Sequence, residues 1–408
     1  MLEKLLKKKR TTALLFVFFL FAFSAVNMKK ELPFLWQAAV EWYGEETEEK
    51  EVGELTGEVT AAVTEQVAGK HGFVDAYGYV QLLLGKEEEG NFETVKDREG
   101  KLHYTYFAEE INDTEELARR AGRLSRMLEA EGTKLLCVMP PDKFIAGHTR
   151  FSAGLPYHMA NETADDFLRR LEGEDVKALD LRKDLADSGL EMSRVFFRTD
   201  HHWRTETAFW AASRFCDWMG ETYGEEMDPE GYFKEPGHYR FITYENAFLG
   251  SMGRKTGRLY AGTDDFTLIF PKFSTDYRYR GSSFGNREFS GRFEEVLIDG
   301  AVLRDGRESF ATDFYGAYLY GNPGFTHIEN RKRPDGPEIC FVKDSFAVPF
   351  AAFVSLRCRT VDLIDPRAFE GDYTEVLKDG GYDYVILMFS PQNLTEEFFS
   401  FCEEEQDA

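Results

Sequence analysis

Residues 338–350 read Glu-Ile-Cys-Phe-Val-Lys-Asp-Ser-Phe-Ala-Val-Pro-Phe, an apolar run that gives way to Asp344-Ser345 and then to a second apolar run. The first run is typical of a buried strand, because it is short and rich in Ile, Phe and Val. The second predicts a helix over about Phe346–Leu356, and a further strand is predicted at Thr360–Ile364. Such a unit indicates parallel strands, and it places Ser345 at the junction where sites form in α/β sheets.

The same alternation begins near residue 112. Four apolar positions recur there at spacings of three and four residues and predict a helix: Leu117, Ala121, Leu124 and Leu128. Asn112 or Asp113 is the predicted cap, and Gly132 the predicted stop.

Further elements continue the alternation. Strands are predicted at Lys134–Met139, Val176–Leu181 and Tyr384–Phe389, and helices from Asn161 onward and over Thr205–Met219 with Gly220 as its end. Strands that alternate with helices predict an α/β fold, in which a mostly parallel sheet is covered by helices on both faces.

The 408 residues carry a formal net charge of -24, from 49 basic and 73 acidic residues. This balance excludes a nucleic-acid partner, which needs a basic surface, and it disfavours adsorption to an anionic membrane surface. Acidic runs at Glu45–Glu54, Glu87–Glu89 and Glu403–Asp407 are interpreted as solvated faces, linker and tail.

The N-terminus carries a targeting or anchoring signal. Lysines and one arginine within residues 4–10 precede an apolar run from about Thr11 to Met28. The run fits a membrane anchor or a signal peptide. A small-x-small cleavage site is poorly formed around Ser24-Ala25, which favours an uncleaved anchor. In both cases the basic end lies in the cytoplasm and the rest outside, so we expect a single-pass protein of the cell membrane, secreted if the segment is cleaved.

These features divide the chain. Residues 1–30 form the basic end and anchor, 31–75 a stalk, 76–402 the α/β domain, and 403–408 an acidic tail. Within the domain, 221–335 loses the alternation and is rich in Gly, Tyr, Phe and Arg, so we expect an irregular insertion that could wall a substrate cleft. Gly72–Leu84 alternates and predicts a strand-turn-strand entry.

The five cysteines form no Cys-x-x-Cys pair. Four of them lie in apolar runs or on an apolar helix face, so buried, reduced cysteine is expected. No zinc-ligand spacing is present, and neither a metal nor a cofactor is predicted.

Residues 198–203 read Arg-Thr-Asp-His-His-Trp. In an extended segment Asp200 and His202 point to one side, where the carboxylate can hold the imidazole, while His201 points away. With Ser345 they make up the three side chains that acyl transfer needs, and the backbone amide of Ser345 or Phe346 is a candidate oxyanion donor.

Plainer interpretations remain open for both segments. Asp344-Ser345 also fits a helix N-cap, Asp200 also fits a cap for the following helix, and the two histidines also fit metal ligands. The segments lie 143 residues apart (345 − 202), so the sequence does not prove that they meet. Both nevertheless sit where a predicted strand gives way to a helix, which is one edge of a parallel sheet.

Thr199 followed by Asp-His-His-Trp resembles the signature of the DHHW family of bacterial proteins. It is also similar to the Thr-Asp-x-His-Trp segment of the alginate O-acetyltransferases, which belong to the SGNH hydrolase-like superfamily in circularly permuted form. Ile339–Pro349 resembles their nucleophile block, and Gly250-Ser251-Met252-Gly253 a glycine-containing segment between the two. The resemblance covers roughly residues 70–400.

This resemblance implies a three-layer α/β/α fold with Ser345 as nucleophile, His202 as base and Asp200 as the residue that orients it. It implies O-acetyl chemistry on a cell-surface polysaccharide outside the membrane. It also implies a membrane-bound O-acyltransferase as a possible partner that supplies the acetyl group.

The chain departs from the wider superfamily at two places. Lys343 stands where a glycine usually precedes Asp-Ser, and Gly321-Asn322 is the nearest match to a Gly-x-Asn oxyanion block. Asn322 is therefore a candidate oxyanion donor, although Gly321-Asn322-Pro323-Gly324 also reads as a turn.

Two further features are candidates for substrate binding. Trp203 either walls the acyl pocket or packs beneath the histidine. Arg198 and the Tyr-Arg-Tyr-Arg run at 277–280 either bind a glycan or form a solvated strand face.

The sequence thus predicts a serine-dependent O-acetyltransferase or O-acetylesterase acting on a cell-surface polysaccharide. The alternative is a non-catalytic glycan-binding or assembly protein with the same fold, motivated by the missing glycine and the uncertain oxyanion donor. Geometry separates the two, because a Ser345 Oγ far beyond about 4–5 Å from the His202 ring would disfavour catalysis.

Overall fold

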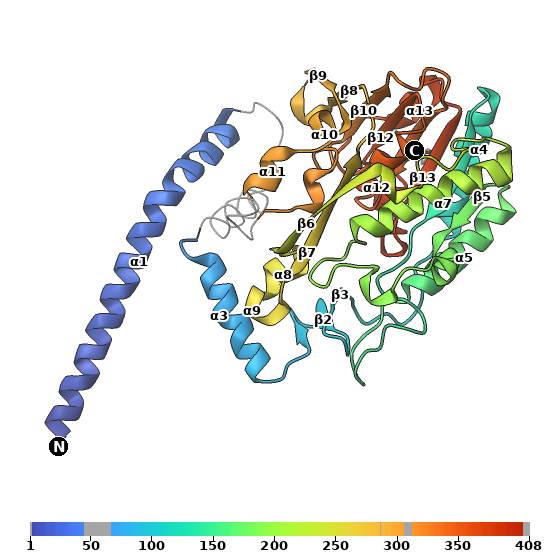
Figure 1. Cartoon of the computed structure of the whole chain (residues 1–408). Coiled ribbons are helices and arrows are strands. Elements are labelled where there is room, and N and C mark those ends of the chain that lie inside the picture. The colour runs from blue at the N-terminus through green and yellow to red at the C-terminus, as the bar shows by residue number, and fades with distance from the viewer. Residues whose placement is uncertain (1, 45–66, 286, 306–311, 403–408) are drawn as a thin grey trace, which may run out of the picture. The chain divides into compact units, whose positions relative to one another are not determined.

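The structure is a computed structural model that describes residues 2–44, 67–285, 287–305 and 312–402 (Figure 1). It divides into two units, Met1–Val80 and Gln81–Ala408. The acidic run at 45–54, most of the predicted stalk and the tail at 403–408 lie outside the described residues.

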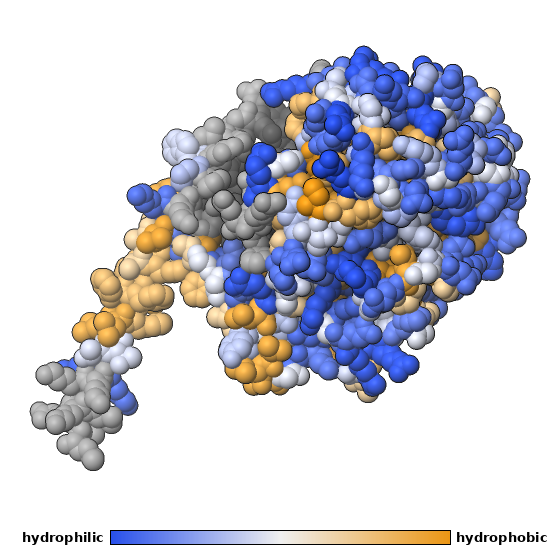
Figure 2. All heavy atoms as spheres, viewed as in Figure 1, coloured by the Kyte–Doolittle hydropathy of each residue, from blue (hydrophilic) through white to orange (hydrophobic). Residues whose placement is uncertain are grey.

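The first unit is helical. Helix α1 spans Leu2–Gly44, and helix α3 spans Lys70–Leu83 and runs into the second unit. Within α1, Lys9–Lys29 has a mean hydropathy of 2.0 and leaves nearly all of its surface exposed. This segment is long and apolar enough to cross a membrane, and it also fits a signal sequence. Figure 2 shows the hydrophobic residues that gather along it.

The second unit is built on a mixed sheet. Among the described residues this sheet has eight strands in the order β5-β4-β13-β11-β12-β10-β8-β9. Its five parallel strands are β5 (Lys177–Asp180), β4 (Lys134–Met139), β13 (Tyr384–Met388), β11 (Glu338–Lys343) and β12 (Thr360–Ile364). Its three antiparallel strands are β10 (Phe325–Asn330), β8 (Tyr277–Gly281) and β9 (Glu288–Gly291).

Two smaller sheets accompany the main one. The first consists of β1 (Glu88–Glu89), β2 (Thr94–Lys96) and β3 (Leu102–Tyr104), and the second of β6 (Tyr239–Phe248) and β7 (Asp264–Pro271). The longer helices are α4 (Glu115–Ala130), α5 (Ala160–Gly173), α7 (Thr205–Tyr223), α12 (Ala347–Val354) and α13 (Tyr373–Asp379). Short helices are α6 (Leu181–Asp184), α8 (Ser251–Thr256), α9 (Arg258–Ala261), α10 (Phe293–Val296) and α11 (Gly300–Asp305).

Helices cover both faces of the sheet, as expected for an α/β fold. One core joins the inner faces of α4 and α5 to β4 and β13, and it holds all four apolar positions predicted for the first helix. The other core lies under α7 and α12. The predicted mostly parallel α/β architecture is therefore confirmed.

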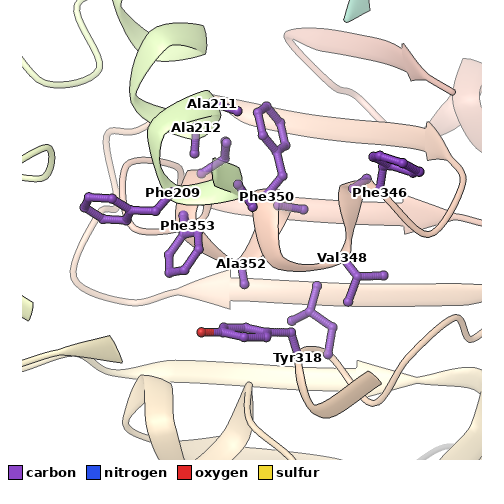
Figure 3. Packing of buried hydrophobic residues seen from close by; sticks show 14 of the residues in the cluster. Phe209, Ala211, Ala212, Tyr318, Phe346, Val348, Phe350, Ala352 and Phe353 are labelled. Atoms are coloured by element: carbon purple, nitrogen blue, oxygen red, sulfur yellow. The ribbon is translucent and has the colours of Figure 1, made fainter. Parts of the chain in front are cut away.

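Helix α12 is buried on all sides, which explains its unbroken apolar sequence. It packs against α7, and Figure 3 shows Phe350 and Phe353 of α12 pointing among Phe209, Ala211 and Ala212 of α7. The ring of Phe350 also lies 5.7 Å from that of Phe215, between ring centroids. This packing fixes the helix that begins directly after Ser345.

Three local expectations are wrong. Gly72–Leu84 is not a strand-turn-strand unit, since all of it but Leu84 lies in α3; Phe73, Tyr77 and Val80 also recur at helical spacing. Helix α7 passes through Gly220, and Gly224 ends it with a positive φ of 71°, where glycine is unstrained.

The third concerns 221–335, which is more regular than expected. It supplies β8, β9 and β10 to the main sheet and the separate β6–β7 pair. Tyr277 and Tyr279 of β8 are fully buried, and Arg278 pairs with Glu288 and Glu329, so these side chains are committed to the fold rather than offered to a glycan.

Replacing Phe350 with alanine is expected to destabilise the second unit by about 3–5 kcal/mol, because it leaves a cavity between α7 and α12. Chemical denaturation of the full chain in mild detergent measures the change. Phe241→Ala, at an exposed position of β6, is the matched control and should shift stability by no more than about 0.5 kcal/mol. Equal effects of the two substitutions would contradict this account of the core.

Candidate active site

The Asp-His segment forms a tight loop. Phe196 and Trp203 pair across its base, and Phe197 N–H donates to the carbonyl of His202 at 3.2 Å. Within the loop, Asp200 Oδ1 accepts from the backbone N–H of His202 at 3.0 Å and lies 2.5 Å from His202 Nδ1. The expected extended conformation is therefore wrong, but the expected pairing of Asp200 with His202 is present.

The other ring nitrogen of the histidine faces the serine. His202 Nε2 lies 2.6 Å from Ser345 Oγ. Asp200 and His202 are buried, while Ser345 is partly exposed. The structure thus brings the two distant segments together in a hydrogen-bonded chain of carboxylate, imidazole and hydroxyl.

Asp344 fixes the turn that carries Ser345. Its Oδ1 accepts from Phe346 N–H at 2.9 Å, and its Oδ2 accepts from Ser390 N–H at 2.7 Å and from Asn393 Nδ2 at 2.8 Å. Asp344 therefore ties the end of β11 to the loop after β13. Because Phe346 N–H is already donated to Asp344, Ser345 N–H is the remaining backbone candidate for an oxyanion donor.

The segment at 250–253 holds the second oxygen of Asp200. Ser251 N–H donates to Asp200 Oδ2 at 2.6 Å, and Gly250 N–H donates to Thr199 Oγ1 at 2.8 Å. A Cβ on Gly250 would lie only 2.2 Å from the Cβ of Asp200. The chain therefore needs glycine at 250 for its backbone to approach the carboxylate.

Two charged side chains hold the backbone of the loop from outside. Asp264, at the start of β7, accepts from Arg198 N–H at 2.7 Å and from Thr199 N–H at 2.8 Å. Buried Lys143 donates from Nζ to the carbonyl of Asp200 at 2.6 Å. Burial lowers the pKa of Lys143 to about 8, against the opposing effect of nearby carboxylates.

The pKa of Asp200 lies well below its usual range. Burial by itself would raise it, but the neighbouring imidazoles of His202 and His201 and the hydrogen bonds to the carboxylate outweigh that effect. Asp200 is therefore ionised at neutral pH and can stabilise an imidazolium at His202.

His201 does not point away from the site, as the extended geometry predicted. Its ring centroid lies 3.8 Å from that of His202, and its Nδ1 lies 3.1 Å from Ser251 Oγ. Burial and the adjacent His202 lower the pKa of His201 to about 3, so this ring is neutral at physiological pH. It lines the cavity at Ser345.

Trp203 packs beneath the site rather than walling an acyl pocket. It is fully buried, and its Nε1–H donates to Tyr315 Oη at 3.1 Å. The Tyr315 ring in turn stacks on the His202 ring, with centroids 3.8 Å apart and an interplanar angle of 11°. Trp203 therefore supports the face of the imidazole through Tyr315.

Asn322 and Arg198 are not placed at the nucleophile. Asn322 Oδ1 accepts from Lys343 Nζ at 2.6 Å, and neither Asn322 nor Arg198 is among the residues that line the cavity at Ser345. Lys343 turns away from the nucleophile and pairs with Asp365 at 3.1 Å in the interior. This explains how a lysine replaces the usual glycine.

The cavity at Ser345 has a volume of about 170 Å³. Sequence reasoning missed several residues that line it: Lys143, Arg367, Gln392 and Asn393. Each lies within a few residues of the carboxyl end of a parallel strand, β4, β12 or β13. That position is the one signal that could have found them.

The histidine loop also contains a cluster of side chains that could hold a cation. Ligand atoms of Asp200, His201 and His202 lie within 4.8 Å of one another. His202, however, uses Nδ1 toward Asp200 and Nε2 toward Ser345, and His201 Nδ1 faces Ser251. A cation would have to displace these hydrogen bonds, so the residues fit an acyl-transfer chain better than a metal centre.

All five cysteines are free, and four of them are buried. This agrees with the expected reduced, buried cysteines.

Replacing Gly250 with alanine is expected to lower turnover of an acetyl ester by about tenfold or more, because the new methyl group pushes the backbone off Asp200. Steady-state kinetics measure the loss. Gly173→Ala, in the last turn of α5 with open space around it, is the control and should leave turnover unchanged. Full activity of the Gly250 variant would show that the contact is not required.

The lowered pKa of Lys143 predicts a pH dependence. Its charge is complete well below pH 8 and is lost as the pH rises through about 8. Turnover should then fall by about fivefold, because charged donors bind carbonyls about 1 kcal/mol more strongly than neutral ones.

Stability changes in the opposite sense. The unfolded chain holds the lysine proton to a pH of about 10.4, so between the two pKa values the group's contribution to stability rises with pH.

The Lys143→Met variant tests the effect on turnover. It should turn over an acetyl ester more slowly than the parent at neutral pH, and its turnover should not decline at alkaline pH. An unchanged profile in the variant would assign the decline to another group.

Comparison with known proteins shows which family the sequence resembles. The model of a family described as "SGNH hydrolase-like domain, acetyltransferase AlgX" matches residues 102–240, which include Asp200 and His202. No curated protein sequence matches the chain.

Two solved structures share the fold. PatB1 of Bacillus cereus, solved with a sulfonyl adduct, superposes with a TM-score of 0.61 at 19% identity, over 76% of this chain and 97% of that chain. A DHHW family protein from Eubacterium siraeum gives 0.57 at 17% identity, over 76% and 99%. The expected resemblance to an SGNH hydrolase-like fold is thus confirmed, since the family model matches residues 102–240, which hold the Asp-His-His-Trp segment, and the two solved structures share the fold over 76% of the chain.

Proposed function

We propose that the protein is a membrane-anchored O-acetyltransferase or O-acetylesterase that acts on a cell-surface polysaccharide outside the cytoplasm. The observation that carries this proposal is the hydrogen-bonded chain from Asp200 through His202 to Ser345. An imidazole held between a buried carboxylate and a hydroxyl is the arrangement that activates a serine.

In the first half-reaction Ser345 Oγ attacks the carbonyl carbon of the acetyl donor. Its proton passes to His202 Nε2, and Asp200 stabilises the resulting imidazolium. Collapse of the tetrahedral intermediate breaks the bond to the donor oxygen, which leaves with the proton from His202. The acetyl group remains on Ser345 as an ester.

In the second half-reaction a hydroxyl group attacks this ester while His202 takes its proton. Ser345 then leaves as the alcohol and recovers the proton. A sugar hydroxyl gives transfer and water gives hydrolysis, so the outcome depends on how far the bound glycan excludes water from the cavity.

Hydrogen-bond donors in the cavity can stabilise the negative charge that develops on the carbonyl oxygen of the substrate. Ser345 N–H is not donated to Asp344, and Lys143 and Arg367 line the same cavity. Gln392 Nε2 is already engaged by Asp142 and His158, and Asn393 Nδ2 donates to Asp344. Positive groups that are fixed before the reaction stabilise an oxyanion without reorganisation.

The substrate class and the location are proposed from the family description and from the N-terminal segment. The family description names an acetyltransferase, and the resemblance to alginate O-acetyltransferases suggests a polysaccharide acceptor. The apolar segment Lys9–Lys29 supports an anchor with the domain outside. A membrane-bound O-acyltransferase is proposed as the acetyl donor by analogy with these relatives.

Two observations favour catalysis over the alternative, a non-catalytic glycan-binding protein. The 2.6 Å separation of His202 Nε2 and Ser345 Oγ falls well inside the limit set for catalysis, and Lys343 is accommodated away from the nucleophile.

A sulfonyl fluoride should modify the full chain once, at Ser345. PatB1 has been solved with a sulfonyl adduct, so this reagent class suits the fold. Mass spectrometry of the parent should show the adduct on Ser345. Ser345→Ala should show none, and His202→Ala should react at least about 10³-fold more slowly.

Ser283→Ala, at an exposed serine, is the control and should be modified like the parent. The acetyl content of surface glycans in cells should change in the Ser345 and His202 variants alone, falling if the protein is a transferase and rising if it is an esterase. A folded chain that gains no adduct from the sulfonyl fluoride or from a smaller acetyl ester would refute the proposed chemistry.

A further inference from the structure

Helix α3 exposes the residues that a helix in water usually hides. Seven apolar residues of α3 and the residue after it are between 45% and 69% exposed: Phe73, Tyr77, Tyr79, Val80, Leu82, Leu83 and Leu84. Gln81, by contrast, is buried, and Asp75 is half-buried. A soluble surface helix has the opposite pattern, and an exposed apolar patch of this kind marks an interaction surface (Figure 2).

The start of α3 lies beside the outer end of the apolar span. Asn27 Oδ1 accepts from Ala68 N–H at 2.7 Å, and the ring of Phe73 meets that of Phe23 edge-on at 5.8 Å between centroids. Phe23 and Asn27 belong to the last two turns of Lys9–Lys29. If this span crosses the bilayer, α3 begins at the level of the outer headgroups.

We propose that α3 is an interfacial helix whose apolar face enters the outer leaflet of the membrane that α1 crosses. The inference rests on the proposed anchor. Tyr77 and Tyr79 each combine an apolar ring with a polar tip, which suits the boundary between acyl chains and water. Leu82, Leu83 and Leu84 supply the aliphatic part of the same surface, at the depth of about 5–10 Å that interfacial helices reach.

Apolar burial rather than charge drives this contact. The chain carries a net charge of -24, and α3 itself has one lysine, one histidine and one aspartate. Zwitterionic lipid therefore suffices as a partner, and anionic lipid adds nothing.

The full chain, reconstituted in phosphatidylcholine vesicles, allows a direct test. Cys402 is the one partly exposed cysteine of the described chain, so a Cys402→Ser background leaves the buried cysteines unlabelled. Single cysteines are then introduced for an NBD fluorophore by Tyr77→Cys in α3, by Phe16→Cys in the span and by Glu129→Cys on the exposed side of α4. The NBD emission of each labelled variant is measured with nitroxide-labelled lipid and with dithionite, which reduces NBD from the water side.

NBD at position 77 should shift to shorter wavelength and lose emission most to a nitroxide near the headgroup. Position 16 should lose emission most to a nitroxide deep in the acyl chain, and position 129 to neither. Quenching at 16 without any at 77 overturns the interfacial helix and leaves the anchor intact. Protection of 77 from dithionite without lipid quenching also overturns it and indicates a protein partner or a second copy instead.

A charged variant gives an independent measurement. Leu83→Glu with Leu84→Glu should remove the lipid quenching at position 77 while position 16 stays quenched. Val74→Ala, on the half-buried side of α3, is the control and should leave the quenching at 77 unchanged. Quenching that survives the two glutamates would overturn the proposal.

Discussion

A single buried carboxylate, that of Asp200, is the constraint around which the site is built. A buried charge is costly unless its oxygens are satisfied. Asp200 receives the N–H and the Nδ1 of His202 on one oxygen and the N–H of Ser251 on the other. Glycine at 250 and the hydrogen bonds that the loop donates to Asp264 let those donors approach the carboxylate.

The parallel strands supply the second half of the arrangement. Carboxyl ends of β4, β11, β12 and β13 meet at one edge, which brings Lys143, Ser345, Arg367 and Asn393 to one cavity from four separate loops. Asp344 links two of these loops by accepting from Ser390 and Asn393. The described residues of 221–335 do not line the cavity, and three of them, Ser251, Asp264 and Tyr315, instead support the histidine loop.

Much of this was predictable, because local patterns decide it. The spacing of Leu117, Ala121, Leu124 and Leu128 and the short apolar runs predicted α4 and the parallel strands. The meeting of His202 with Ser345 was predicted correctly, but from a premise that is only half right: Ser345 follows β11, whereas the described residues directly before the histidine loop form no strand of the main sheet. Long-range packing decided the rest. Trp203, Arg198 and Asn322 are governed by contacts with residues more than 20 positions away, and Gln392 and Asn393 carry no motif. The prediction for α3 was wrong because its sequence fits both the two-residue period of a strand and the 3.6-residue period of a helix.

Asp365 has a consequence for how this protein can change. Its carboxylate is shared by Lys343, behind the nucleophile, and by Arg367, on the cavity wall. The two cations depress the pKa of Asp365, while burial acts against them. Altering either cation changes the counter-charge of the other, so their substitutions will not add. A substitution behind the nucleophile at Lys343 therefore also alters the counter-charge of Arg367, so it is felt on the wall of the cavity as well as in the interior.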